Sequence, residues 1–386
     1  MAENKEKKVL NVPNLRFPEF EGEWEEHYLS DYLDFKNGLN PKPERFGKGI
    51  RFISVMDILN NAVITNDCIR ASVDVSEEEL LSFCVENGDI LFQRSSETLE
   101  DVGRANVYMD NKPAVFGGFV IRGKKKAEYD PLFFRYLLAS PFARKKIIPM
   151  GAGAQHFNIG QEGLNKVKLH FALLDEQKKI ARLLSLLDER IATQNKIIED
   201  LQSLIKGIAQ HWIKNITSRS IYVKLGDICQ ITTGKLDANA QVDNGIYPFF
   251  TCAEQPFKID SFAFDTEALL ISGNGANLGY INYYNGKFNA YQRTYVLDVF
   301  SENIQYIKWV LKVLLPKRIA IEKSSSNTPY ILLSTLSDLM LPIPSKENQY
   351  HIAELMQSLE RKLSSQITLN GSYNILKQYL LRQMFI

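Results

Sequence analysis

In the run IARLLSLLDERIATQNKIIEDLQSLIKGIAQHW, which extends from Ile180 to Trp212, apolar residues return alternately after four and three positions. Such alternation is the a/d repeat of a coiled coil, and it predicts a helix of roughly 50 Å at about 1.5 Å per residue. Leu183, Ile197 and Leu204 lie beside the a positions and widen the apolar stripe, which is typical of a helical bundle. The predicted seam consists of Ile180, Leu184, Leu187, Ile191, Gln194, Ile198 and Leu201, and continues through Ile205, Ile208 and Trp212.

The same helix pattern returns near the end of the chain. Gln177-Lys-Lys-Ile-Ala181 is matched by Gln349-Tyr-His-Ile-Ala353, and the same offset relates Leu169 to Leu341. The alternative is two unrelated amphipathic helices, each in a globular core. The seam of the second helix is predicted at Ile352, Met356, Leu359, Leu363 and Gln366.

Polar residues interrupt the apolar stripe of both predicted helices. Gln194 and Gln366 occupy the same repeat position, where one polar residue can set the register of a coiled coil, although an exposed glutamine is the alternative. Asn370 and Gly371 interrupt the second stripe, so we expect a local register shift or a bend there. The stripe then resumes on Leu369, Tyr373, Leu376 and Leu380.

The segments outside the helices are rich in strand and turn signals. Both follow one plan of apolar strand, polar loop, glycine, aromatic strand, turn and strand, with short helices expected near 131–140 and 303–315. In the second segment, Asn285-Gly286 between two strand-like runs predicts a hairpin. The predicted fold class is α+β, with two mixed α/β domains separated by two long antiparallel coiled-coil helices and related by a pseudo-twofold internal repeat.

Composition excludes several classes of protein. Lys and Arg number 46 and Asp and Glu 45, so the net charge of +1 argues against a protein that coats nucleic acid by charge alone. No apolar run approaches the ~18 residues of a membrane span, and the charged start of the chain lacks the apolar core of a secretory signal. The cysteines form no CxxC pair, so we expect a cytoplasmic protein without a metal site or disulfides; they are Cys68, Cys84, Cys229 and Cys252.

Motifs for catalysis are missing from the sequence. It contains no GxxxxGK[ST], HExxH or GxSxG pattern and no Asn-Pro-Pro-aromatic motif. Gly273-Asn-Gly275 continues to Gly279 as GxGxxxG and leads into an aromatic strand, whereas a dinucleotide site needs a helix there. These observations favour a binding protein over an enzyme.

The first residues with a family resemblance lie near the N-terminus. Pro13-Asn-Leu-Arg-Phe-Pro-Glu-Phe-Glu-Gly-Glu-Trp24, followed by Leu29-Ser-Asp31, resembles the start of specificity subunits of type I restriction-modification systems. Leu173-Leu-Asp-Glu-Gln177 resembles the beginning of their central helix, and Gln349 that of their C-terminal helix. Here Asn348 precedes Gln349, where the family has Glu. The resemblance extends over essentially the whole chain.

The resemblance implies a division of the chain into four parts. These are a first target-recognition domain over 1–172 with an N-terminal extension over 1–24, a central helix over 173–218, a second target-recognition domain over 219–344 and a C-terminal helix over 345–386. Each domain would read one half of a bipartite, asymmetric DNA site, and the helices would act as a spacer and as a docking surface for methyltransferase subunits. A rod of roughly 50 Å is long enough to hold two readers about one DNA turn, ~34 Å, apart.

The resemblance also implies the partners of the chain. They are double-stranded DNA, two methyltransferase subunits and two restriction/translocase subunits, with no membrane. S-adenosylmethionine, ATP and Mg²⁺ would be held by the partner subunits, and this chain would contain no cofactor, no metal and no catalytic residue.

Residues that contact DNA are expected on loops and in basic patches. Arginine pairs with guanine, asparagine and glutamine pair with adenine, and basic side chains neutralise phosphates. The alternative for each is a connecting loop or a solvated face. The candidates in the first domain are Arg94, Ser95, Ser96, Arg104, Lys124, Lys125, Arg144, Lys145, Gln155 and His156, and those in the second are Asn274, Asn277, Gln292, Arg293, Ser325 and Asn327.

A second function remains open at this point. The same repeat could be a non-enzymatic adaptor, in which two β-rich protein-binding modules are carried on a helical spacer. Binding of DNA by the assembled complex would distinguish the two functions.

Overall fold

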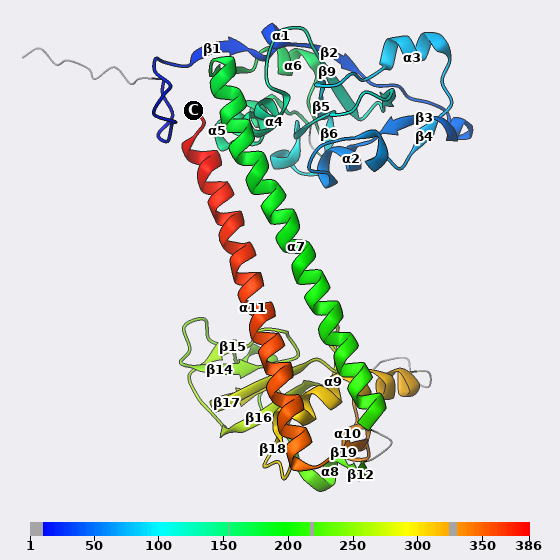
Figure 1. The fold of residues 1–386 in the computed structure, drawn as a ribbon, viewed down its shortest axis with the longest axis vertical. Helices are drawn as coiled ribbons and strands as arrows, with labels where there is room; N and C mark the ends of the chain where they lie inside the picture. Colours follow the sequence, from blue (N-terminus) through cyan, green and yellow to red (C-terminus); the bar gives the residue numbers. More distant parts are fainter. Residues whose placement is uncertain (1–10, 154, 217–219, 324–329) are drawn as a thin grey trace, which may run out of the picture. The chain divides into compact units, whose positions relative to one another are not determined.

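The computed structural model describes residues 11–153, 155–216, 220–323 and 330–386. The chain divides into a first unit, residues 1–195 and 369–386, and a second unit, residues 196–368. Each unit contains one globular domain and a part of both long helices, α7 (Leu174–Ile216) and α11 (Lys346–Gln383) (Figure 1). The predicted fold class is therefore confirmed. No helix in the described part of the chain is long and apolar enough to cross a membrane.

The globular domain of the first unit is built on a four-stranded sheet of order β2-β9-β5-β7 and a three-stranded sheet of order β4-β3-β8. Two small sheets pair β1 with β11 and β6 with β10. The strands are β1 (Glu25–Tyr28), β2 (Leu33–Asn37), β3 (Phe46–Ile53), β4 (Ser72–Val73), β5 (Ile90–Gln93), β6 (Ser95–Ser96), β7 (Ala105–Val107), β8 (Ala114–Phe116), β9 (Val120–Lys125), β10 (Phe157–Asn158) and β11 (Lys168–Phe171). The helices are α1 (Leu29–Tyr32), α2 (Val55–Asn60), α3 (Glu77–Phe83), α4 (Pro131–Ala139), α5 (Pro141–Ile147) and α6 (Gln161–Asn165), with 3-10 turns η1 (Pro43–Arg45), η2 (Asn66–Cys68), η3 (Leu99–Asp101) and η4 (Ile148–Met150).

The globular domain of the second unit is built on a six-stranded sheet of order β13-β18-β16-β17-β14-β15, with β12 paired to β19 beside it. The strands are β12 (Ile221–Lys224), β13 (Gln230–Thr233), β14 (Tyr247–Phe250), β15 (Phe257–Ile259), β16 (Phe264–Ser272), β17 (Ile281–Ala290), β18 (Thr294–Asp298) and β19 (Met340–Ile343). The helices are α8 (Leu225–Ile228), α9 (Ile304–Lys323) and α10 (Leu333–Ser337), with the 3-10 turn η5 (Ala238–Ala240).

The hairpin predicted at Asn285-Gly286 is wrong. β17 continues through both residues, and they pair with Glu267 and Thr266 of β16. β16 pairs with β17 both before and after the Asn-Gly pair, from Phe264 to Ile271. This strand pairing overrides the local turn preference of Asn-Gly. Gly286 keeps a φ of 128°, a conformation that glycine adopts without strain.

Within each unit the two long helices are antiparallel. In the first unit Asn195 of α7 accepts a hydrogen bond from Asn370 of α11 (2.8 Å), and Asp188, earlier in α7, forms an ion pair with Lys377, later in α11 (2.5 Å). In the second unit, Ile205 and Ala209 of α7 pack with Met356 of α11 and with Trp309 of α9. The same two helices are therefore antiparallel in both units (Figure 1).

The seam of α7 contains the residues with the four-and-three spacing. Ile180, Leu184 and Gln194 are buried, Gln194 to 2% exposure, and Leu187, Ile191, Ile198 and Leu201 are half-buried. The expected widening is wrong at Ile197 and Leu204, which are exposed because no third helix of the described chain covers them. At Ile197 and Leu204 only the seam itself faces the partner helix, whereas Ile180, Leu184 and Ile205 also pack in the cores with α4 or α9.

The register shift expected in α11 is also wrong. The helix is continuous, and the four-and-three spacing runs unbroken from Ile352 to Leu380. Leu376, where the apolar stripe was expected to resume, is exposed, and Lys377 beside it is half-buried on Asp188. Some seam positions of α11 are polar residues that are paired with α7. A search for apolar residues alone therefore misses the continuous register. The seam positions of α11, all buried or half-buried, are Ile352, Met356, Leu359, Leu363, Gln366, Asn370, Tyr373, Lys377 and Leu380.

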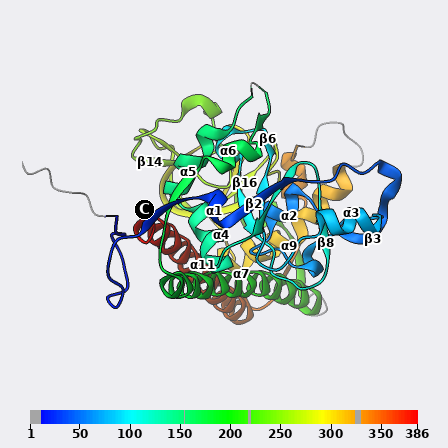
Figure 2. The ribbon, with the colours of Figure 1, turned by 90° about the horizontal axis from the view of Figure 1, so that it is seen from above.

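Each core joins its sheet to its own part of the helices. In the first unit α4 lies between the four-stranded sheet and the long helices (Figure 2): its Phe133 and Phe134 share a core with Ile90 and Phe92 of β5, and Tyr136 donates a hydrogen bond to Asp188 (2.9 Å). In the second unit α9 takes this place, and a core containing Ile307 and Leu311 extends to Ile213 of α7 and Ala353 of α11. The helices are thus part of each domain's core.

Candidate nucleic-acid interface

The loops that contain most candidate residues leave one end of the four-stranded sheet in the first unit. Four strand ends meet there. The ladders bring the last residues of β2 and β5, Asn37 and Gln93, next to the first residues of β9 and β7. We call the loops that meet there, residues 38–41, 94–96, 103–104 and 117–119, the first loop edge.

The second unit repeats this arrangement strand for strand. In the order β13-β18-β16-β17, the ladders bring together Thr233 at the end of β13, Thr294 at the start of β18, Ser272 at the end of β16 and Ile281 at the start of β17. We call the loops at this end, residues 234–240, 273–280 and 291–293, the second loop edge.

Four backbone hydrogen bonds recur in the two loop edges. Gly38 donates to Val120 and Gly234 to Thr294, both at 3.2 Å, and Val120 donates to Gly117 and Thr294 to Tyr291, both at 2.8 Å. Arg94 donates to Phe119 (2.9 Å) as Gly273 does to Arg293 (2.8 Å), and Ile159 donates to Arg94 (2.9 Å) as Ile331 does to Gly273 (2.8 Å). The backbone scaffold is therefore common, and the side chains on it differ.

Several candidates meet at the first loop edge. Ser95 and Ser96 form β6, which pairs with β10, and the Ser95 hydroxyl hydrogen-bonds to the side chain of Asn158. Arg94 donates from Nη1 to the carbonyl of Gly118 (3.2 Å), which ties two of the loops together. Gln155 and His156 are exposed directly before β10.

Arg104 belongs to the first loop edge, and Arg144 of α5 lies beside it. Arg144 donates from Nη2 to the carbonyls of Glu100 (2.9 Å) and Val102 (2.6 Å), and burial lowers the pKa of its guanidinium to about 10. Arg104, paired with Asp101, lines a hollow of about 300 Å³ together with Arg144. Arg135 and Lys377 line the same hollow, so it is cationic, whereas Lys145 is exposed on α5.

Two of the candidates lie elsewhere. Lys124 and Lys125 pair with Asp34 and Leu33 at the far end of β9, away from the first loop edge. Lys124 forms an ion pair with Glu86 (2.7 Å), and Lys125 donates to the carbonyl of Tyr129 (3.2 Å). A basic run in the sequence does not show which end of a strand it occupies.

In the second loop edge the candidates surround a residue that sequence reasoning missed. The Cys252 thiol donates to Asn274 Oδ1 (3.0 Å), and Asn277 Nδ2 donates to the Cys252 carbonyl (3.0 Å). Asn274 and Asn277 therefore hold the loop, whereas Gln292 and Arg293 are exposed. No sequence signal marks Cys252, and Ser325 and Asn327 lie outside the described residues.

Two glutamines, which the sequence marked only as a repeat, join each domain to its helix. Gln177 Oε1 accepts from the backbone N–H of Asp130 at the start of α4 (3.0 Å), and its Nε2 donates to the carbonyl of Ala172 (2.8 Å). Gln349 repeats both bonds with Asn303 at the start of α9 (3.0 Å) and the carbonyl of Pro344 (3.0 Å). Both glutamines are buried.

The residues before the two glutamines, Glu176 and Asn348, lie in different surroundings. Glu176 is buried, accepts two hydrogen bonds from Arg16 (2.7 and 2.8 Å) and a third from the indole of Trp24 (3.2 Å). The N-terminal segment is thus held against the start of α7. Its counterpart Asn348 is exposed on α11.

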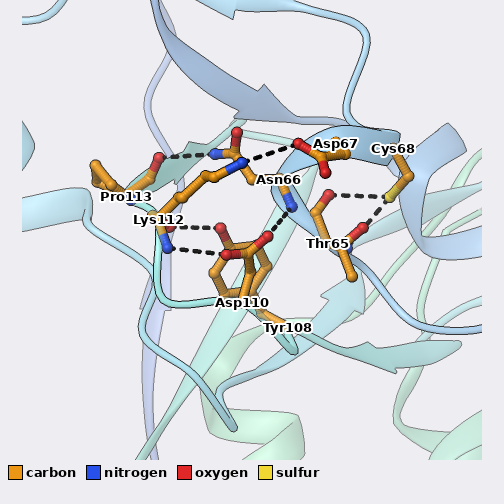
Figure 3. A network of polar contacts seen from close by, with 8 residues as sticks. All are labelled: Thr65, Asn66, Asp67, Cys68, Tyr108, Asp110, Lys112 and Pro113. Atoms are coloured by element: carbon orange, nitrogen blue, oxygen red, sulfur yellow. Dashed lines mark hydrogen bonds and ion pairs between the residues drawn. The ribbon is translucent and has the colours of Figure 1, made fainter.

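A dense polar network in the first unit is structural (Figure 3). The Asp110 carboxylate accepts from the backbone N–H groups of Asn66 (2.9 Å) and Lys112 (3.0 Å), and these bonds lower its pKa. Tyr108 donates to the Lys112 carbonyl (2.6 Å), and burial raises the pKa of its phenol to about 12. The network fastens η2 to the turn between β7 and β8. In the described part of the chain no group of three or more His, Cys, Asp and Glu could hold a metal.

The family described as "Type I restriction modification DNA specificity domain" matches residues 21–203 and again 220–370. The EcoDI type I restriction enzyme specificity subunit of Escherichia coli is 43% identical over 143 residues, which are 37% of this chain and 32% of that subunit. The match thus spans about a third of that relative's length. The MjaVIII specificity subunit of Methanocaldococcus jannaschii is 22% identical over 413 residues, 92% of this chain and 90% of that subunit.

Solved structures share the fold. The crystal structure of a type I restriction-modification S subunit from M. genitalium is similar with a TM-score of 0.65 at 19% identity, covering 97% of this chain and 99% of that one. A chain from a structure on complex assembly and conformational transition of the type I system has a TM-score of 0.58 at 15% identity, covering 94% and 97%.

Proposed function

Because the chain belongs to the type I restriction-modification DNA specificity family, we propose that each of its globular domains reads one half of a bipartite, asymmetric DNA site. The observation that carries this proposal is the pair of loop edges, since one backbone scaffold presents different side chains in the two units. Two unlike readers select two unlike half-sites. Arg94 and Arg104 in the first loop edge and Gln292 and Arg293 in the second belong to residue types that read base edges.

Contacts to the DNA backbone would come from the cationic hollow beside the first loop edge. Arg104 and Arg144 supply charge there, and this charge would attract a phosphate to the hollow. With a net charge of only +1, the chain would depend on partner subunits for most of the phosphate neutralisation.

The long helices would be the spacer and the docking surface for methyltransferase subunits. Each helix has an apolar seam turned to its partner and further apolar side chains that remain exposed. Exposed apolar residues at helical spacing are typical of surfaces that receive another helix. These residues are Leu186, Ile197 and Leu204 on α7, and Leu355, Ile367, Ile375, Leu376 and Tyr379 on α11.

In this function the chain is the non-catalytic subunit of its complex. S-adenosylmethionine would be bound by two methyltransferase subunits, and ATP and Mg²⁺ by two restriction/translocase subunits. The described residues offer hydrogen-bonding loops and a basic hollow, which are features of recognition and not of bond-making chemistry.

The test is methylation of a random-sequence duplex library by the chain assembled with its methyltransferase subunit. We expect one motif with two separated, unlike halves. The variant Arg293→Ala should relax the half read by the second unit and leave the other half unchanged. A single continuous motif, or methylation without sequence preference, would count against the proposal and favour an adaptor that only gathers protein partners.

A further inference from the structure

Exposed apolar side chains lie on the first loop edge and on α2 beside it. Phe119 is 68% exposed and Met56 is 61% exposed. Both line a hollow of about 380 Å³, whose other walls include Leu39, Phe52 and Val55. A hollow with apolar walls and exposed apolar side chains at its edge is a surface that a ligand can cover.

The backbone repeat makes Phe119 the counterpart of Arg293. The carbonyl of Phe119 accepts from Arg94, and the carbonyl of Arg293 accepts from Gly273, at equivalent places in the two scaffolds. Val120 and Thr294, the residues that follow, close the same turn onto Gly117 and Tyr291. The two units therefore present a phenyl ring and a guanidinium at one structural position.

The turn before Phe119 lies close to two side chains that line the hollow. A Cβ atom on Gly118 would lie 1.9 Å from Asn40 Oδ1, and a Cβ atom on Gly117 would lie 2.7 Å from the Phe52 ring. The two glycines thus allow Asn40 and Phe52 to close against the turn. Asn40 is exposed at the rim and brings an amide to the apolar hollow.

We infer that Phe119 is a specificity-determining residue, which contacts the 5-methyl group of a thymine in the half-site read by the first unit. This inference rests on the proposed function. In the major groove only thymine presents a methyl group, and phenylalanine is among the side chains that contact it. The Asn40 amide can donate a hydrogen bond to thymine O4 or bind adenine N6 and N7. The polar edge of a G·C pair would face the phenyl ring without a hydrogen bond.

The inference is tested with the chain assembled with its methyltransferase subunit and a duplex of its own recognition sequence. Each thymidine is replaced in turn by deoxyuridine, which removes the methyl group and keeps the base pairing. Loss of one buried methyl group should weaken binding about fourfold. We expect this loss at one thymine of the first half-site.

Variants assign the effect to the residue. Phe119→Ser should bind the thymidine and deoxyuridine duplexes equally, at the weaker level, whereas Phe119→Leu should retain the dependence on the methyl group. Arg293→Ala is the matched control at the equivalent position and should leave the deoxyuridine effect of the first half-site unchanged. Because Phe119 is exposed, all variants should keep the wild-type unfolding midpoint.

Two results would overturn the inference while the proposed function stands. One is sequence-specific binding that no deoxyuridine substitution in the first half-site weakens. The other is a deoxyuridine effect that persists unchanged in Phe119→Ser. A complex without any sequence preference would instead overturn the proposed function itself.

Discussion

Gln177 and Gln349 each join a globular domain to the start of a long helix through the same two hydrogen bonds. Each side chain accepts from the backbone N–H of the residue just before α4 or α9 and donates to a carbonyl just before its own helix. The glutamine amide can make both bonds because it has a donor and an acceptor at the end of one side chain. The repeated glutamine is therefore a positioning residue, which fixes the angle between a domain and its helix.

Replacing Gln177 by alanine should destabilise the first unit by about 1–3 kcal/mol, since a buried N–H and a buried C=O lose their partner. Gln349→Ala should cost a similar amount in the second unit. The measurement is urea unfolding, with Gln202→Ala on the exposed face of α7 as the control. Equal stability of Gln177→Ala and Gln202→Ala would show that the glutamine bonds are not structural.

At the scale of the elements, α7 and α11 keep one register although polar residues interrupt their apolar pattern. Asn370 and Lys377 occupy seam positions and are paired with Asn195 and Asp188. Arg135 and Tyr136 of α4 also reach Asp188, so one carboxylate links three helices. Polar seam residues with unique partners favour a single alignment of the two helices.

The seam predicts unequal effects of neighbouring substitutions in α7. Ile205 is 6% exposed against Met356 and Trp309, whereas Leu204 is 51% exposed. Ile205→Asp would bury an unpaired carboxylate and should cost about 3 kcal/mol or more, while Leu204→Asp should cost under about 1 kcal/mol. Thermal unfolding of both variants checks the register; equal losses would contradict it.

At the scale of the whole molecule, one plan occurs twice with different details. Each unit contains a loop edge with the same backbone hydrogen bonds and a glutamine with the same two bonds. Each also contains an equivalent helix, α4 in the first unit and α9 in the second. The N-terminal segment, held by Glu176, belongs to the first unit only. One scaffold with different side chains is what the proposed reading of two unlike half-sites requires.

The spacer proposal predicts that longer helices lengthen the gap between the half-sites. Duplicating residues 196–202 in α7 together with 363–369 in α11 adds one heptad to each helix and keeps the seam spacing. At about 1.5 Å per residue the addition is about 10 Å, or roughly 3 base pairs of DNA. Methylation of a library with variable gaps should show a longer preferred gap and unchanged half-sites.

The control for this experiment is the duplication in α7 alone. It leaves the two seams of unequal length and should lower the unfolding midpoint. A preferred gap that stays the same in the double duplication, with the protein folded, would refute the spacer role.

The sequence predicted the helices and the repeat better than it predicted the loops. Heptad spacing identifies a seam from one helix alone, because the period reflects which side chains face a partner. The polar seam residues Asn370 and Lys377 escaped this reasoning, since their partners lie far away in the chain. Lys124 and Lys125 illustrate the same limit for the candidate interface, because only the ladder with β2 shows which end of β9 they occupy.

By itself, the sequence determined two related helices, two unlike α/β domains and the family to which the chain belongs. These follow from periodicity and from order along the chain, which are local or repeated signals. Only the tertiary structure decided which loops meet at one end of each sheet, that Asn274 and Asn277 hold Cys252, and that Phe119 occupies the position of Arg293. The physical reason is that strand pairing joins residues distant in sequence, and hydrogen bonds between loops depend on the strand order that the whole fold sets.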